Sequence, residues 1–130
     1  MSVVVLDASA AVELLLGTVA GGRVRRSLRR KTVAVPGHLE AEVLSALGRL
    51  ARGGAVGEER VGAALARLVQ APFRRFPLAP LVAEAWALRA NLSLRDALYV
   101  TLARRLEATL VTADARLARA PDLGIALTLV

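Results

Sequence analysis

Carboxylates are the side chains of this sequence whose placement could support chemistry, and two of them stand just beyond apolar runs that read as buried strands. Asp7 follows the run Val3–Leu6, and Asp114 comes shortly after the run Ala108–Val111. Ligands of open parallel sheets bind outside the carboxyl ends of the strands, at a switch point in the strand order. We therefore expect both carboxylates to face one crevice if their strands are neighbours.

Two further acids stand beside apolar helix faces. The residues after Asp96, 97–103, read as a helix without a charge on any face, which is typical of a buried helix. Placing a carboxylate at the mouth of such a helix is costly unless it has a partner. Glu42 borders the apolar stripe of a predicted helix, but Glu40 lies on the opposite margin, so periodicity does not choose between the two glutamates.

Each of these acids also has a purely structural explanation. Asp7 and Asp114 would cap the helices that follow them, and Asp96 would complete a capping box. Glu42 would be a solvated helix charge. The structural explanation is the commoner one for any single acid, but the joint arrangement of all of them favours a common site.

Converging carboxylates need a positively charged partner. Two unit charges about 4 Å apart repel by roughly 4 kcal/mol at an effective dielectric constant of about 20, so some acids must protonate or bind a divalent cation. The sequence has no cysteine and one histidine, which leaves oxygen ligands and favours Mg²⁺ or Mn²⁺. An all-acid site for such an ion in a basic chain indicates phosphodiester hydrolysis.

The composition predicts a soluble protein with an anionic partner. The chain has 130 residues, 55% of them hydrophobic, and we expect a single domain over residues 1–130. Lys and Arg number 18 against 11 Asp and Glu, a net charge of +7. Arginine forks match phosphate oxygens, although an arginine-rich composition alone would also explain the excess. Without a membrane span or a signal peptide in the sequence, we expect a cytoplasmic protein.

Strands alternate with helices along the whole chain. The predicted strands are Val3–Leu6, Thr32–Val35, Phe73–Phe76, Ala108–Val111 and Gly124–Val130. The predicted helices are Ala10–Leu16, Val19–Lys31, His38–Arg52, Glu58–Gln70, Leu81–Ala90, a helix from Ser93 to about Arg105, and Arg116–Arg119. This alternation predicts an α/β fold in which helices cover both faces of a central parallel sheet.

Four stretches of the sequence resemble the PIN-domain ribonucleases, in particular the VapC-type toxins of bacterial toxin–antitoxin pairs. They match the family in order and spacing over nearly the whole chain, and they are Val4–Ala10, Val35–Leu44, Leu92–Ala103 and Leu110–Leu117. The resemblance implies a PIN-like three-layer α/β/α sandwich with a central parallel sheet. It also implies a Mg²⁺- or Mn²⁺-dependent endoribonuclease that hydrolyses RNA phosphodiester bonds.

The resemblance also implies roles for individual residues. Its acidic catalytic pocket would consist of Asp7, Glu42, Asp96 and Asp114, with Glu42 selected over Glu40. The expected metal ligands are Asp7, Asp96 and Asp114. Ser9 and Thr112 are expected to support the pocket by hydrogen bonds.

Arginines are the candidates for contacts with RNA. Arg95 and Arg116 stand beside acids of the expected pocket. Many relatives carry a further Asp or Asn shortly after the last motif aspartate, whereas this chain has Arg116 two positions after Asp114, so we expect three or four protein acids rather than five. Arg26 and Arg29 belong to a basic stretch that fits either an RNA- or antitoxin-binding surface or a solvated helix face.

Proteins similar to this chain form homodimers and are neutralised by a cognate antitoxin, which commonly places a basic side chain in the acidic pocket. We therefore expect RNA, an antitoxin and a second copy of the chain as partners. The alternative is a catalytically silent PIN-like module that binds RNA or an antitoxin. A receiver-like domain is disfavoured because the only lysine, Lys31, comes too early, and a haloacid-dehalogenase-type phosphatase because Ser9 stands where it needs a second aspartate.

The remaining polar and aromatic candidates have structural interpretations. His38 stands at a helix start after Pro36 and Gly37, and we expect a surface or capping residue. Trp86 and Tyr99 occupy apolar helix positions, so we expect core or dimer packing in preference to stacking on bases.

Overall fold

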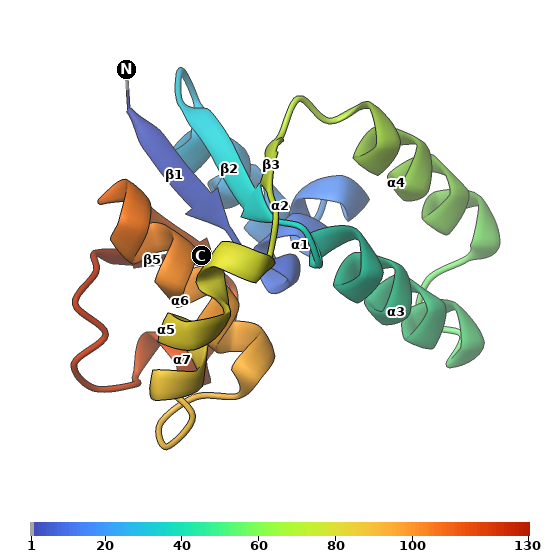
Figure 1. The fold of residues 1–130 in the computed structure, drawn as a ribbon. Helices are drawn as coiled ribbons and strands as arrows, with labels where there is room; N and C mark the ends of the chain where they lie inside the picture. The colour runs from blue at the N-terminus through green and yellow to red at the C-terminus, as the bar shows by residue number, and fades with distance from the viewer. Residues whose placement is uncertain (1) are drawn as a thin grey trace.

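A parallel β-sheet forms the centre of the molecule (Figure 1). The structure is a computed structural model that describes residues 2–130. Its sheet has five strands in the order β3-β2-β1-β4-β5, and every neighbouring pair is parallel. The strands are β1 Val3–Leu6, β2 Thr32–Pro36, β3 Arg74–Phe76, β4 Thr109–Thr112 and β5 Leu127–Leu129. The predicted parallel sheet is confirmed.

Helices cover both faces of this sheet. They are α1 Ala8–Leu16, α2 Val19–Leu28, α3 Leu39–Arg52, α4 Glu58–Gln70, α5 Val82–Ala87, α6 Leu94–Leu106 and α7 Ala115–Ala118, with a short 3₁₀ helix at Ala79–Leu81. Helix α1 packs with α2, α3 and α4, whereas α6 packs with α5 and against β1, β2 and β4 from the other side (Figure 1). The result is the predicted α/β/α sandwich. Within residues 2–130 no helix is both long enough and apolar enough to cross a membrane.

The order of the strands creates a switch point between β1 and β4. The chain first builds the half β1-β2-β3 and then returns to add β4 and β5 on the other side of β1. In the register of the two central strands Leu6 lies opposite Val111, so β1 and β4 end side by side. The backbone N–H of Asp7 donates to the carbonyl of Val111 at 3.2 Å, which extends the pairing to the first residue after β1. Crevices of doubly wound sheets open at such points.

The central strands are buried because both of their faces are covered. Val5 and Leu6 are inaccessible to solvent, as are Val35 of β2 and Leu110 of β4. An unbroken apolar run is the pattern that a strand covered on both faces requires. The core therefore holds the carboxyl ends of β1 and β4 in fixed positions.

Most differences from the predicted elements lie at their ends. Helix α2 stops at Leu28 and not at Lys31, because Arg30 has a left-handed backbone (φ 62°) and the N–H of Lys31 turns back to the carbonyl of Leu28. Helix α5 is shorter than predicted at both ends, and a 3₁₀ turn that contains Pro80 precedes it. The last strand, β5, covers only part of the predicted range. These local deviations leave the strand order unchanged.

Candidate active site

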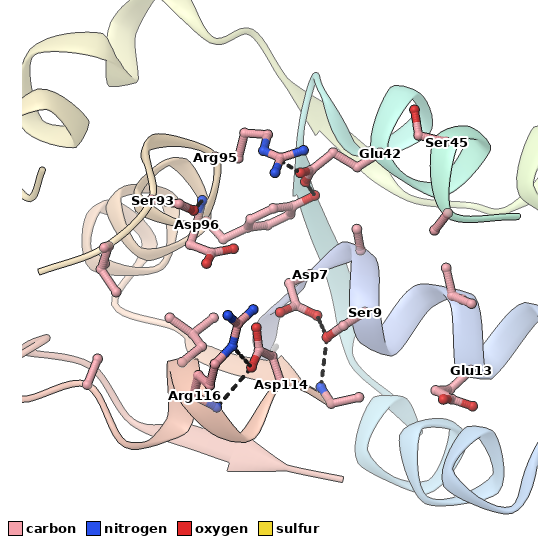
Figure 2. Close-up of a pocket in the computed structure, with 18 of the residues that line it drawn as sticks. Asp7, Ser9, Glu13, Glu42, Ser45, Ser93, Arg95, Asp96, Asp114 and Arg116 are labelled. Carbon is pink, nitrogen blue, oxygen red and sulfur yellow. Dashed lines mark hydrogen bonds and ion pairs between the residues drawn. The ribbon is translucent and has the colours of Figure 1, made fainter. Parts of the chain in front are cut away.

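A cavity of about 770 Å³ opens beyond the carboxyl ends of β1 and β4 (Figure 2). Its walls include all of the acids singled out from the sequence, namely Asp7, Glu42, Asp96 and Asp114. We call these residues the acidic pocket. They come from four segments far apart in the chain: the start of α1, the first turns of α3 and α6, and the start of α7. Figure 2 shows the side chains of Asp7, Asp96 and Asp114 facing a common space.

Asp7 is both the cap of α1 and a wall of the pocket. Its Oδ1 accepts hydrogen bonds from the N–H of Ala10 (3.0 Å) and the hydroxyl of Ser9 (2.7 Å), and its Oδ2 accepts one from the hydroxyl of Thr112. The residue is 3% exposed. Burial raises the pKa of Asp7 above its ordinary value; these hydrogen bonds oppose the rise, and the charge of Asp96 adds to it.

Ser9 and Thr112 tie Asp7 to the segment that follows β4. The hydroxyl of Ser9 accepts from the N–H of Ala113 at 3.0 Å, and that of Thr112 accepts from the N–H of Asp114 at 3.0 Å. The two hydroxyl oxygens lie 3.2 Å apart. One hydrogen-bonded network therefore fixes the positions of Asp7 and Asp114 relative to each other.

Asp114 and Asp96 both lie at the N-terminal ends of helices. Asp114 caps α7 by accepting from the N–H of Arg116 (2.8 Å), and the guanidinium of Arg116 lies 3.6 Å from the same carboxylate. Asp96 lies in the first turn of α6, where its N–H donates to the capping hydroxyl of Ser93 at 3.1 Å. Burial raises the pKa of Asp96, and the negative charges of Asp114 and Glu42 raise it further.

Glu42 is held by three neighbours on the opposite wall. The hydroxyl of Tyr99 donates to Glu42 Oε1 at 2.7 Å, and His38 Nε2 lies 3.4 Å from the same oxygen. The guanidinium of Arg95 lies 3.6 Å from Oε2. Glu40, the other glutamate considered, pairs instead with Arg75 and does not line the cavity. The structure thus puts Glu42, and not Glu40, among the acids of the pocket.

Tyr99 and His38 take part in the site more directly than their sequence positions indicated. Tyr99 is 1% exposed, as core packing requires, but its hydroxyl reaches Glu42. Burial and the contact with Glu42 raise the pKa of Tyr99 far above the ordinary range, so it remains a hydrogen-bond donor. His38 occupies the cap position of α3 without a capping hydrogen bond; it donates to the carbonyl of Arg95 (3.1 Å), and its ring centroid lies 4.6 Å from that of Tyr99.

The carboxylate oxygens of the acidic pocket are suitable ligands for a divalent cation, although the side chains are not grouped closely around one point. Burial disfavours the charged forms of Asp7 and Asp96, and nearby negative charges add to the effect: that of Asp96 on Asp7, and those of Asp114 and Glu42 on Asp96. A divalent cation relieves that repulsion, and oxygen ligands are those preferred by Mg²⁺. Among residues 2–130 no three His, Asp or Glu side chains are close enough to hold one ion as placed. As the side chains are placed, an ion would have at most two of them as ligands and water for the remainder, and binding by three acids requires them to move closer to one another.

The arginines chosen as RNA contacts separate into two groups. Arg95 and Arg116 line the cavity, whereas Arg26 lies on α2 and Arg29 directly follows it, and neither lines the cavity. A further arginine, Arg49, lines the cavity and was not singled out. The signal that could have found it is its place on α3, about two helical turns after Glu42 and therefore on the same face.

Of the two alternatives expected for Trp86, the structure contradicts core packing, and packing in a dimer stays a prediction. The side chain is 55% exposed, and the guanidinium of Arg89 lies 4.6 Å from the centroid of its ring. Its neighbour Ala85 is the residue of α5 that is buried. The helix is too short for the apolar pattern of its sequence to distinguish the two faces.

Comparison with known proteins identifies the family of this fold. Residues 4–123 match the family described as PIN domain. Ribonuclease VapC3 of Mycobacterium tuberculosis (strain ATCC 25618 / H37Rv) is 50% identical over 118 residues, which are 90% of this chain and 86% of that protein.

Solved structures show the same fold at lower sequence identity. VapBC2 from Rickettsia felis, bound to a DNA fragment from its promoter, has a chain with a TM-score of 0.68 and 16% identity that covers 98% of both chains. VapC20 of Mycobacterium tuberculosis, described as a sarcin-ricin loop cleaving toxin, has a TM-score of 0.64 and 21% identity over 90% of this chain and 93% of its own. The family match and the identity to VapC3 together show that this chain belongs to the PIN-domain family, among its VapC proteins.

Proposed function

We propose that this protein is a Mg²⁺- or Mn²⁺-dependent endoribonuclease and the toxin of a VapBC-type toxin–antitoxin pair. The observation that carries the proposal is the acidic pocket at the switch point of the sheet, in a chain with a net charge of +7. The excess of arginine attracts an RNA backbone, while the buried acids provide the chemistry. The relative VapC3, which is named a ribonuclease, supports RNA as the substrate.

Asp7, Asp96 and Asp114 are the residues that would hold the divalent cation. When bound, such an ion supplies Lewis-acid stabilisation of the charge that develops on the phosphoryl oxygens. Ser9 and Thr112 support this role because their hydroxyls fix the carboxylate of Asp7 in one orientation. The hydroxyl of Thr112 also accepts a hydrogen bond from the backbone N–H of Asp114, so two of the three acids are positioned by the same network.

The other wall of the pocket orients the substrate. Tyr99, His38 and Arg95 hold Glu42 beside the space that the aspartates face, where its carboxylate can accept a proton from an attacking water. Arg95 and Arg116 have strongly exposed side chains that can reach a phosphate. In the absence of RNA each of these arginines pairs with an acid of the pocket.

The proposal includes an antitoxin, a second copy of the chain and a cytoplasmic location. A cationic side chain from an antitoxin suits the pocket for the same reason as a metal ion, since it compensates buried carboxylates. The VapBC2 structure of Rickettsia felis, one chain of which has the same fold, supports a protein partner of this kind. The homodimer rests on the resemblance to VapC toxins, and the cytoplasmic location on RNA as the substrate.

A PIN-like module that binds RNA or an antitoxin without cutting is the second candidate. The observation that favours it is that no three acidic side chains of the described residues stand close enough to share an ion. Cleavage assays distinguish the two functions. A silent module would bind RNA with or without Mg²⁺ and would leave it intact.

The deciding experiment measures RNA cleavage with and without Mg²⁺ or Mn²⁺. We expect Asp7→Asn and Asp96→Asn each to lower the cleavage rate by roughly 10²-fold or more while the fold is kept. The matched control is Asp122→Asn, because Asp122 is an exposed acid outside the cavity and asparagine tolerates its left-handed backbone (φ 52°). Cleavage that survives both pocket substitutions, or that persists in a chelator, would overturn the proposal.

A further inference from the structure

Arg49 places an unpaired guanidinium in the wall of the active-site cavity. It lies on α3 and is exposed, and within residues 2–130 its side chain makes neither a hydrogen bond nor an ion pair. The other arginines that line the cavity differ in this respect. Arg95 lies against Glu42 and Arg116 against Asp114, so their charges compensate acids of the pocket. Arg49 is therefore the cavity cation left free for a ligand.

The cavity extends from the acidic pocket toward Arg49 between two helices. Glu13 of α1 and Ser45 of α3 also line the cavity, and Figure 2 shows both of them away from the aspartates. Glu42, Ser45 and Arg49 follow one another on one face of α3, because successive spacings of three and four residues return to the same side of a helix. Glu42 and Arg49 are about 10 Å apart along the helix axis.

That separation is too large for one phosphate group and suits two phosphates of the same strand. Phosphates of one strand are about 3.4 Å apart along the axis of a stacked helix and farther apart in an extended strand. A phosphate near Arg49 therefore belongs to a nucleotide within about three positions of one held at the acidic pocket. A guanidinium fork matches phosphate oxygens in geometry as well as in charge.

We propose that Arg49 forms a second phosphate-binding position for the RNA strand, on one side of the bond that is cut. This inference rests on the proposed ribonuclease function and adds the direction of the substrate: the strand runs along α3, away from the aspartates. Glu13 on the facing wall is held by the hydroxyl of Thr18 and repels phosphate. The strand consequently lies nearer to α3 than to α1.

The first test compares Arg49→Gln with Arg52→Gln in binding of a fluorescently labelled single-stranded RNA. Both arginines are exposed on α3, but Arg52 does not line the cavity, so it is a matched control for the loss of one charge. Binding is followed by anisotropy in a chelator over a series of salt concentrations. Each phosphate contact on a single strand contributes about −0.7 to the slope of log K against log [salt]. We expect Arg49→Gln to reduce the slope by about 0.7 and Arg52→Gln to leave it unchanged.

The second test neutralises single RNA phosphates as methylphosphonates, one position at a time around the cleavage site. In the wild type and in Arg52→Gln, neutralising one particular phosphate within about three nucleotides of the cut should raise KM about tenfold. In Arg49→Gln the same neutralisation should have no further effect, because the contact is already lost. This coupling between a residue and a phosphate is a readout that a general loss of stability would not produce.

The outcomes separate this inference from the function on which it rests. If Arg49→Gln keeps the wild-type salt slope and the wild-type response to every methylphosphonate while Asp7→Asn abolishes cleavage, the Arg49 position is wrong and the ribonuclease stands. An equal loss of slope in Arg52→Gln would also overturn it, since the effect would then be one of net charge. If the wild type neither binds nor cleaves RNA, both proposals fail together.

Discussion

The carboxylate of Asp7 accepts hydrogen bonds from Ser9, Ala10 and Thr112, yet it is buried beside Asp96. Capping and chemistry are therefore not alternatives at this residue. The hydrogen bonds hold the carboxylate in place, while burial raises its pKa and makes the charged form unfavourable. In a ribonuclease that binds a cation here, the free protein would carry this unfavourable charge in order to bind the ion.

The first residue-scale prediction is that Asp7→Asn stabilises the metal-free protein at neutral pH. A carboxyl with a raised pKa binds its proton more tightly in the folded state than in the unfolded state. The free energy of unfolding therefore falls as the pH rises from the unfolded value of 3.8 through the raised pKa, and the loss persists at neutral pH. Asparagine cannot ionise, and we expect its Tm at neutral pH to lie several degrees above that of the wild type.

Thermal unfolding in a chelator over a range of pH measures this effect. The wild type should become more stable on acidification through that window, and Asp7→Asn should lose part of the dependence. Asp96, whose pKa is also raised, should contribute to the part that remains. Asp122→Asn, at an exposed acid, is the control. A lower Tm for Asp7→Asn at neutral pH would show that its hydrogen bonds matter more than its charge.

Tyr99 is the subject of the second residue-scale prediction. Tyr99→Phe removes the hydroxyl that donates to Glu42 and keeps the buried ring. We expect unfolding to become easier by about 1.5 kcal/mol, because a hydrogen bond to a charged group is lost. We also expect the cleavage rate to fall about tenfold with little change in KM, because Glu42 loses one of the hydrogen bonds that position its carboxylate.

A hydroxyl elsewhere on α6 supplies the control for Tyr99→Phe. Thr101 is buried, and its hydroxyl has no hydrogen-bond partner among residues 2–130. Thr101→Val should therefore leave cleavage unchanged and the stability equal or slightly higher. Equal rates for Tyr99→Phe and the wild type would remove Tyr99 from the site.

At the scale of elements, α2 approaches the C-terminal half of α1 unusually closely. A Cβ atom added to Gly21 would lie 2.1 Å from the carbonyl oxygen of Glu13, which no side chain can tolerate. Glycine at this position lets the two helices touch through their backbones. Helix α1 carries Asp7 at its start, so this packing also supports the pocket.

The element-scale prediction compares two adjacent glycines of α2. Gly21→Ala should destabilise the protein by about 3 kcal/mol, because α2 must shift away from α1. Gly22→Ala should have no such effect and should stabilise the helix by up to about 1 kcal/mol, since an added Cβ there meets only the end of Arg26, at 4.0 Å. Chemical denaturation of both variants measures the difference. Similar losses in the two would mean that glycine at position 21 is not required by packing.

The sequence predicts the boundaries of helices and strands correctly where a local signal marks them. The strand β1 and the cap of α6 at Ser93 follow from local signals, and both were predicted correctly to within a residue or two. The end of α2 depends on the left-handed turn at Arg30, which no glycine or proline announces. Of the two alternatives for Trp86, core packing was wrong because α5 is too short to show a periodic apolar face, and dimer packing stays a prediction.

At the scale of the molecule, the site exists because the strand order brings β1 and β4 together. The sequence places Asp7 and Asp114 at strand ends, but it contains no local signal for which strands are neighbours. Resemblance to a family supplied that step and the choice of Glu42 over Glu40. Arg49 was missed for the related reason that its place in the cavity depends on how α3 lies against α1.

The last prediction concerns the whole molecule, because cation binding to the folded state raises its stability. Only the fold assembles the acids, so Mn²⁺ at a hundredfold excess over its Kd should add about 2.7 kcal/mol to the free energy of unfolding. The gain in Tm should shrink as the pH falls through the raised pKa values of Asp7 and Asp96, because protons then compete with the ion. Asp96→Asn should lose most of the gain, whereas Asp122→Asn should keep it. Thermal unfolding with and without Mn²⁺ measures all of these effects. If Mn²⁺ does not change the Tm of the wild type at neutral pH, the acidic pocket does not bind the cation that explains why its acids converge.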